Sequence, residues 1–319
     1  MSQILLIAAR EFGFENGKLI TGGFQNQVYE YEVKGFKRIL RISDTNRRSC
    51  KEIQSELNWL SFLIQNGISV CRPIKSKNGN LLIEGEGSIA VSFEKAPGNP
   101  ANVSSQGEWN GSFFKEWGRY IGRIHSLSKQ TEVQRLFRPR WREDHQDVLK
   151  LGMQIQDRII KEKYLKLLGK LKSFTISNDN FGLIHNDFHQ GNFFVHNGEI
   201  TAFDFDDCAY YWFANDIAVA FYHAYWQGIS FRPDIKEFGN YFIDHFFQGY
   251  SETNKLTAEI INQIPVFLKI REVFLYHLFV SSWNMSQLED WQTETLKSIK
   301  ESIMNETPYS DVLFSEKTI

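Results

Sequence analysis

The sequence predicts a two-lobed α+β protein in which a small antiparallel sheet with one helix precedes a larger, mainly helical lobe. Its 319 residues exceed the usual size of one domain, roughly 100 to 200 residues. Hydrophobic residues make up 42% and charged residues 23%, which is typical of a folded globule. Strand patterns dominate the first ninety-odd residues, and helical patterns dominate the rest.

The first lobe begins with a hairpin pattern. Residues 28–33 and 38–42 are rich in β-forming side chains and flank a short turn at Lys34-Gly35. A helix is expected next, because Ile53, Leu57, Leu60 and Ile64 recur at helical spacing before Asn66-Gly67, which is a stop signal. Further strands are expected at residues 81–84 and 89–93, joined by Gly85-Glu86-Gly87.

Residues 96–100 contain two prolines and a glycine, the composition of a hinge. We therefore expect lobes at residues 1–95 and 96–319, the first for nucleotide binding and the second for catalysis and substrate. Amphipathic helices are predicted around residues 113–124 and 159–171, with several more between 238 and 291. One polar, strand-like segment at residues 182–207 interrupts these helices.

This polar segment carries the candidate chemistry. His185, Asp187 and Asn192 stand in the spacing H-x-D-x-x-x-x-N, which is that of a kinase catalytic loop. Asp204 follows after a turn at Asn197-Gly198, which would return it to the side of Asn192. A carboxylate can orient an acceptor hydroxyl and take its proton, and Mg²⁺ prefers carboxylate and amide oxygens. Asp187 fits the base, and Asn192 and Asp204 fit the metal.

The first lobe offers matching residues. Arg41 lies on the second strand of the hairpin, and Glu56 lies at the edge of the buried face of the following helix. A strand cation that pairs with a helix glutamate contacts nucleotide phosphates in kinases. Gly22 and Gly23 precede the first paired strand, where their backbone N–H groups can approach phosphates closely.

In these residues the chain resembles the aminoglycoside phosphotransferase and choline kinase family, which has the protein-kinase-like fold. The resemblance extends from Gly22-Gly23 to residues 215–218 and is most specific from His185 to Asn192 and at residues 203–207. It implies an ATP- and Mg²⁺-dependent phosphotransferase that uses a hydroxyl acceptor. The roles that it implies are catalysis by Asp187, metal binding by Asn192 and Asp204, and nucleotide binding by Gly22, Gly23, Arg41, Glu56, Phe93 and Lys95.

The same resemblance places adenine against residues 93–95 and gives Asp216 a bracing role under the catalytic loop. Three positions depart from the family pattern. Asn186 replaces the usual small residue after the loop histidine, Gln190 replaces the usual proline, and Arg41 replaces the lysine of many kinases. The first two changes are polar and remove no catalytic group, and the third keeps the positive charge but presents a planar fork in place of a point donor.

Other readings of these residues are open. His185, Asp187 and His189 alternate, so an extended segment would place them on one face, as in a metal-dependent hydrolase. His185 alone is better explained as a structural residue, and the role of His189 is undecided. Residues 85–90 match a dinucleotide fingerprint but lie between strands, which indicates a turn. Glu56 could form an ordinary surface salt bridge.

The composition limits the classes of binding partner that we expect for this protein. Thirty-six Lys and Arg residues against 38 Asp and Glu leave a net charge of −2, which argues against nucleic acid. The opening apolar run is too short to span a membrane. Three cysteines without C-x-x-C spacing suit the cytoplasm. We expect a small-molecule acceptor such as choline or ethanolamine, homoserine, a sugar or an aminoglycoside; a Ser/Thr protein kinase-like enzyme or a pseudokinase binding module is the alternative.

Overall fold

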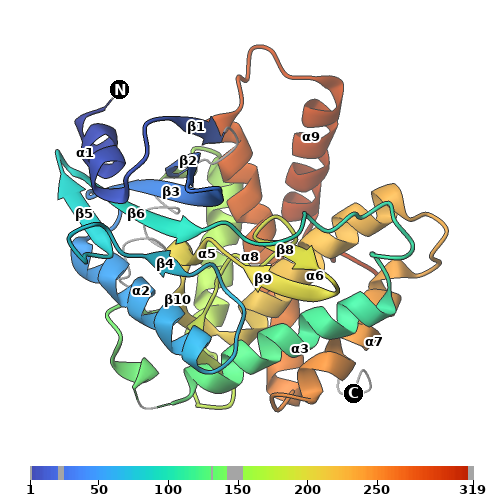
Figure 1. The fold of residues 1–319 in the computed structure, drawn as a ribbon. Coiled ribbons are helices and arrows are strands. Elements are labelled where there is room, and N and C mark those ends of the chain that lie inside the picture. The colour runs from blue at the N-terminus through green and yellow to red at the C-terminus, as the bar shows by residue number, and fades with distance from the viewer. Residues whose placement is uncertain (1, 21–24, 131, 142–153, 315–319) are drawn as a thin grey trace. The chain divides into compact units, whose positions relative to one another are not determined.

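The computed structural model describes residues 2–20, 25–130, 132–141 and 154–314 (Figure 1). The chain forms two compact units. Unit 1 comprises Met1–Pro100, Thr131–Arg138 and Asn192–Asp206, and unit 2 comprises Ala101–Gln130, Pro139–Gly191 and Asp207–Ile319. The division into lobes at residues 95 and 96 stays a prediction.

A six-stranded antiparallel sheet forms the centre of unit 1 (Figure 1). Its strands follow the order β1-β2-β3-β6-β4, and β5 also pairs with β6. The bounds are β1 (Gly17–Ile20), β2 (Gln27–Val33), β3 (Phe36–Asp44), β4 (Pro73–Ile74), β5 (Leu82–Gly85) and β6 (Ser88–Glu94). The small antiparallel sheet expected from the sequence is therefore present.

Three hairpins of unit 1 share one kind of two-residue turn. Lys34-Gly35 joins β2 to β3, Glu86-Gly87 joins β5 to β6, and Asn197-Gly198 joins β8 (Phe193–His196) to β9 (Glu199–Ala202). Both residues of each turn have positive φ, as two-residue hairpin turns that match the strand twist require. Residues 85–90 are thus a hairpin and not a dinucleotide site.

The described residues of unit 1 form two α-helices, one before β1 and one between β3 and β4. The helix α2 (Cys50–Gln65) begins at a capping box in which Ser49 and Glu52 satisfy each other's backbone N–H groups. The helix α1 (Gln3–Phe12) was not expected, because its apolar run was considered only as a membrane segment. Its buried face, Ile4, Leu5, Ala8 and Phe12, packs against the sheet beside β5 and β6 (Figure 1).

Unit 2 is mainly helical, as the sequence predicts. Its helices are α3 (Gly111–Ser128), α5 (Arg158–Lys172), α6 (Phe213–Phe231), α7 (Phe238–Ser251), α8 (Ala258–Ser282) and α9 (Asp290–Asn305). The strands β7 (Phe181–Ile184) and β10 (Ala209–Trp212) form a separate antiparallel pair. In the described part of the chain no helix combines the length and the hydropathy that a bilayer crossing needs.

The proline-rich segment at residues 96–100 is anchored to the β8–β9 hairpin within unit 1. Asn99 and Val195 exchange backbone hydrogen bonds of 3.2 and 2.8 Å. Gly98 has φ of 83°, and a Cβ atom there would lie 2.0 Å from the carbonyl oxygen of Val195. Only glycine fits this close approach, so the segment is a fixed connection of unit 1.

Substitution of Gly98 by alanine should destabilise the protein more than the same change at Gly79. Both glycines have left-handed φ, 83° and 84°, but Gly79 has open space around it. The backbone strain alone costs about 1 to 2 kcal/mol, whereas Gly98→Ala must also displace a backbone carbonyl. We expect the Gly98→Ala loss to be at least about twice the Gly79→Ala loss in urea unfolding followed by tryptophan fluorescence. Equal losses would contradict the close-approach argument.

Candidate active site

A buried ion pair joins β3 to α2 in unit 1. Arg41 Nη1 and Nη2 donate to Oε1 and Oε2 of Glu56 at 2.8 and 2.7 Å. These parallel bonds need a planar guanidinium, because a lysine ammonium cannot form them. Burial alone lowers the pKa of Arg41, but the carboxylates of Glu56 and Asp206 outweigh burial and raise the pKa above its ordinary value. The expected pairing is present and both partners are buried, so it is not a surface salt bridge.

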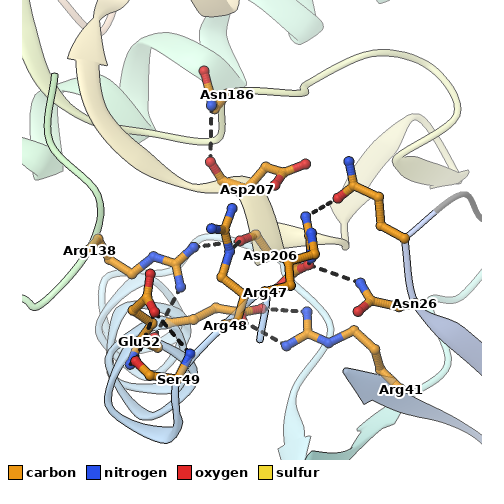
Figure 2. A network of polar contacts seen from close by, with 12 residues as sticks. Asn26, Arg41, Arg47, Arg48, Ser49, Glu52, Arg138, Asn186, Asp206 and Asp207 are labelled. Atoms are coloured by element: carbon orange, nitrogen blue, oxygen red, sulfur yellow. Dashed lines mark hydrogen bonds and ion pairs between the residues drawn. The ribbon is translucent and has the colours of Figure 1, made fainter. Parts of the chain in front are cut away.

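A second carboxylate, Asp206, lies at the centre of a polar network in unit 1 (Figure 2). Asn26 Nδ2 donates to its Oδ2 at 2.9 Å, and Arg47 Nη1 pairs with the same oxygen. Arg48 and Arg138 donate to its backbone carbonyl. Burial alone would raise the pKa of Asp206, but Arg41 and Arg47 hold it well below its ordinary value. The side chain is therefore ionised.

Three buried polar atoms around this network have no hydrogen-bond partner among the described residues. They are Nε of Arg41, Oδ1 of Asn26 and Oδ1 of Asp206. A buried polar atom without a partner costs free energy, commonly about 1 to 3 kcal/mol, unless water or a ligand satisfies it. These atoms offer one N–H donor and two oxygens, which are suitable groups for a phosphate and its counter-ion.

The β8–β9 hairpin brings Asn192 and Asp204 to its open end, as the sequence predicts. Phe193 pairs with Ala202 in the last rung of the ladder. One residue beyond, Phe203 N–H donates to the carbonyl oxygen of Asn192 at 3.0 Å. Asp204 comes next and has φ of 62°, a left-handed conformation that aspartate tolerates better than most residues. The two candidate metal ligands thus lie within one residue of a shared backbone hydrogen bond.

The donor set suits a hard cation. Asn192 supplies an amide oxygen and Asp204 an exposed carboxylate, and Mg²⁺ commonly uses one or two protein oxygens together with phosphates and waters. Within the described ranges, no three His, Cys, Asp or Glu side chains are grouped so that they could hold a metal ion. The metal-binding roles of Asn192 and Asp204 stay predictions.

The candidate catalytic loop lies in unit 2, where Asp216 of α6 braces it. Asp216 Oδ2 accepts from His185 N–H at 3.0 Å, and Oδ1 accepts from Asn186 N–H at 2.7 Å. Asn186 has φ of 73°, which explains why a small residue or asparagine suits this position. Its side chain donates to the carbonyl oxygen of Asp207 at 3.1 Å (Figure 2). The bracing role expected for Asp216 is confirmed.

Asp216 also accepts from a buried histidine of α3. His125 Nε2 lies 3.2 Å from Asp216 Oδ2, and Nδ1 lies 3.0 Å from the hydroxyl oxygen of Tyr250. Because an ionised carboxylate only accepts, we assign the ring proton to Nε2, and Tyr250 then donates to Nδ1. Burial lowers the pKa of His125 despite the nearby carboxylate. The neutral imidazole therefore links α3, α7 and the catalytic loop.

Asp187 has a partner that the sequence did not suggest. Arg271 Nη2, on α8, donates to Asp187 Oδ1 at 2.7 Å. Burial alone would raise the pKa of Asp187, but Arg271 and, less strongly, His189 outweigh it and hold the pKa far below its ordinary value. A signal was available, since Arg271 and Glu272 are charged residues within a largely apolar stretch of α8, and charged residues are rarely buried without partners.

Of the remaining candidates for nucleotide binding, the structure describes Phe93 and Lys95. Phe93 is buried on β6, with its ring 5.4 Å from the Arg41 guanidinium. The Lys95 ammonium pairs with Glu30 of β2, and the amide of Glu94 donates to the carbonyl oxygen of Arg72 at 2.9 Å. Gly22 and Gly23 lie outside the described residues. Adenine recognition by residues 93–95 and phosphate recognition by the two glycines stay predictions.

The hydrolase alternative is not supported. His185 is fully buried, and its ring packs edge-on against Phe188 at 5.1 Å. The left-handed Asn186 breaks the extended backbone that would place His185, Asp187 and His189 on one face. His185 Nδ1 accepts from Asp187 N–H at 3.4 Å, so this histidine supports the loop.

In unit 1 a β3 cation pairs with an α2 carboxylate, and a hairpin ends at Asn192 and Asp204. In unit 2 Asp216 braces the candidate catalytic loop. These features are those of a protein-kinase-like phosphotransferase. Residues 16–252 match the phosphotransferase enzyme family. The chain is 35% identical to the amicoumacin kinase of Bacillus subtilis (strain 168), over 98% of this chain and 95% of that protein. It belongs to the phosphotransferase enzyme family and is a kinase.

Solved structures agree with this assignment. An amicoumacin kinase in complex with AMP-PNP, Ca²⁺ and Ami has a TM-score of 0.86 and 34% identity, covering 98% of this chain and 95% of that one. A microcompartment-associated aminopropanol kinase has a TM-score of 0.73 at 21% identity, with 94% of each chain covered. The second comparison shows a shared fold.

Loss of the Glu56 carboxylate should be strongly destabilising. Glu56→Gln removes one partner of a fully buried ion pair and leaves Arg41 charged, which typically costs about 3 to 5 kcal/mol. Glu30→Gln is the matched control, because the Glu30–Lys95 pair is partly exposed and such pairs contribute about 0 to 1 kcal/mol. The measurement is urea unfolding of the two variants. A Glu56→Gln loss as small as that of Glu30→Gln would show that the pair does not stabilise unit 1.

Stability should fall as the pH drops below about 6.5. Native His125 has a lowered pKa, whereas in the unfolded chain it takes up a proton near pH 6.5. Below this pH the unfolded state therefore binds more protons than the native state. The contribution of His125 to the free energy of unfolding is complete above pH 6.5 and falls below it by up to about 1.4 kcal/mol per pH unit. Urea unfolding between pH 8 and 5.5 should show a shallower pH dependence in His125→Gln. The control is His196→Gln, at an exposed histidine, for which we expect the pH dependence of the wild type. If His125→Gln also shows the wild-type pH dependence of unfolding, His125 does not make this contribution.

Proposed function

We propose that this enzyme transfers the γ-phosphoryl group of ATP, as its Mg²⁺ complex, to a hydroxyl group of a small molecule. A bond forms between the acceptor oxygen and the γ-phosphorus, and the bond from that phosphorus to the β,γ-bridging oxygen breaks. ADP leaves with the electron pair, and the hydroxyl proton is released. The observation that carries this proposal is the hairpin that places Asn192 and Asp204 at one end.

In unit 1 we assign to Arg41 the neutralisation of negative charge on the nucleotide phosphates. Glu56 orients Arg41 for this role. The buried Nε of Arg41, which has no partner among the described residues, leaves one N–H available for a phosphate oxygen. Asn192 and Asp204 would hold Mg²⁺, which supplies electrostatic stabilisation of the phosphate oxygens when bound. Gly22 and Gly23 would contribute backbone N–H groups. These roles rest on the family pattern and on the chemistry of the donors.

In unit 2 we assign to Asp187 the positioning of the acceptor hydroxyl. Asp216 fixes the backbone just before this residue through two hydrogen bonds, so the carboxylate is held on a rigid loop. Rigid placement matters because a misplacement of about 1 Å can lower the rate by roughly 10²-fold. Asp187 accepts a hydrogen bond from the hydroxyl and thereby directs its oxygen toward phosphorus.

For the acceptor we propose amicoumacin or a closely similar antibiotic. This rests on the amicoumacin kinase of Bacillus subtilis, whose similarity extends over 95% of its length, and on the solved amicoumacin kinase with 34% identity. Aminopropanol, choline, homoserine and an aminoglycoside are the comparison acceptors. Mg²⁺ as the metal and the cytoplasm as the compartment belong to the same proposal.

Asp187→Asn and Asp204→Asn should each lower kcat by about 10²- to 10⁴-fold, the range typical of acid–base and charge-stabilising groups. A coupled assay of ADP release with amicoumacin and the comparison acceptors would measure this. Asp244→Asn is the control, because Asp244 is an exposed carboxylate on α7. Its kcat should equal that of the wild type.

Two results would overturn the proposal. If Asp187→Asn keeps most of the wild-type turnover, this residue does not direct the hydroxyl. If none of the five acceptors increases ADP release while AMP-PNP and Mg²⁺ still raise the melting temperature, the acceptor assignment is wrong although the nucleotide assignment holds.

A further inference from the structure

Three side chains of unit 2, Arg271, His223 and His189, lie around the candidate catalytic carboxylate of Asp187. Arg271 Nη2 donates both to Asp187 Oδ1 and to His223 Nε2, at 2.7 Å in each case. Arg271 Nε donates to the same His223 nitrogen at 3.2 Å. Arg271 lies on α8 and His223 on α6. Two helices far apart in sequence therefore meet at the carboxylate of Asp187.

His223 can serve only as an acceptor in this arrangement. A guanidinium has donors and no acceptor, so His223 Nε2 must carry its lone pair toward Arg271. The ring is therefore neutral, with its proton on Nδ1. Burial lowers the pKa of His223 well below its ordinary value, and His189 and Arg271 lower it further. The nearby Asp187 carboxylate acts in the opposite direction but does not prevail.

The second oxygen of Asp187 faces another histidine. His189 Nε2 lies 3.6 Å from Asp187 Oδ2, and His189 Nδ1 accepts from the Gly191 N–H at 3.0 Å. The His189 and His223 rings stack with their centroids 4.3 Å apart. Each carboxylate oxygen thus faces a different nitrogen donor, and the two histidines hold each other in place.

We propose that Arg271, held by His223, is a positioning residue that fixes the carboxylate of Asp187 for the acceptor hydroxyl. This inference rests on the proposed function. The side chain of Arg271 is 91% buried, since 9% is exposed, and the Phe274 ring lies 5.1 Å from its guanidinium carbon. It is therefore restricted in its own motion. Arg271 at Oδ1 and His189 near Oδ2 together restrict the orientation of the Asp187 carboxylate.

A purely structural role would give a different result. If Arg271 only joined α8 to the loop, its loss would lower stability and leave the rate per folded molecule unchanged. If it positions Asp187, its loss lowers kcat of the folded enzyme while the KM for ATP stays nearly constant. The split between kcat and KM therefore separates the two roles.

The test compares Arg271→Met, Arg271→Lys and His223→Leu with the full-length wild-type chain. Lysine keeps the positive charge but supplies a single flexible donor group, and leucine removes the acceptor that holds the guanidinium. Arg232→Met is the matched control, because Arg232 is also buried and paired with an aspartate, Asp234, at 2.8 Å. Each variant is assayed for ADP release with amicoumacin and Mg·ATP, and for unfolding in urea.

We expect kcat to fall about 10²-fold in Arg271→Met and less in Arg271→Lys and His223→Leu, with KM for ATP within three-fold of wild type. A kcat for Arg271→Met within three-fold of wild type, or a loss no greater than that in Arg232→Met, would overturn the inference. Asp187→Asn separates the two proposals. If it is inactive while Arg271→Met is fully active, only the positioning role fails; if it is active, the proposed function fails.

Discussion

Buried carboxylates must be compensated, and this constraint organises the candidate active site. Moving a carboxylate out of water costs several kcal/mol unless cations or hydrogen-bond donors surround it. Glu56 meets this need with a two-bond guanidinium contact, and Asp216 meets it with two backbone N–H groups and an imidazole. Asp206 uses Arg47 and Asn26. Each solution ties together different segments of the chain, from 15 positions apart for Glu56 and Arg41 to 180 for Asp206 and Asn26.

The compensating partners decide which element each carboxylate can stabilise. Glu56 connects a helix to a strand, so it fixes a cation beside the sheet. Asp216 connects the first turn of a helix to the backbone of a loop, so it fixes the loop itself. Because such contacts are short and directional, loss of one partner leaves a buried charge that no small rearrangement can satisfy. The same groups that stabilise each unit therefore also hold the candidate site residues of that unit in place.

The sequence was sufficient for features that depend on local chemistry. The three hairpin turns follow from residue pairs that tolerate positive φ, and α2 is marked by its apolar spacing and by the stop at Asn66-Gly67. The spacing from His185 to Asn192 located the candidate catalytic loop, and the hairpin after it explained why Asp204 returns to Asn192. The pairing of Arg41 with Glu56 was also accessible, because the helical phase of Glu56 left it at the edge of the buried face.

The sequence was not sufficient for contacts between distant segments. Arg271 follows Asp187 by 84 positions, and Asn26 precedes Asp206 by 180; no periodicity or spacing rule connects such pairs. The helix α1 was missed for another reason. Its ten residues contain an apolar face, and Gly13 caps their C-terminal end. The run was tested only as a membrane segment, and its partner surface on the sheet is formed much later in the chain.

The pairing of Asp187 with Arg271 bears on how the hydroxyl loses its proton. A carboxylate whose pKa is held far below the ordinary range is a weak base, and proton abstraction by it before bond formation would be slow. Phosphoryl transfer passes through a loose transition state in most analyses, so the acceptor oxygen needs little negative charge until the new bond is nearly complete. Orientation of the hydroxyl is then worth more than early deprotonation. A carboxylate held by a guanidinium suits that task. The guanidinium lowers the basicity of the carboxylate, on which the reaction depends little, and gives it a defined position.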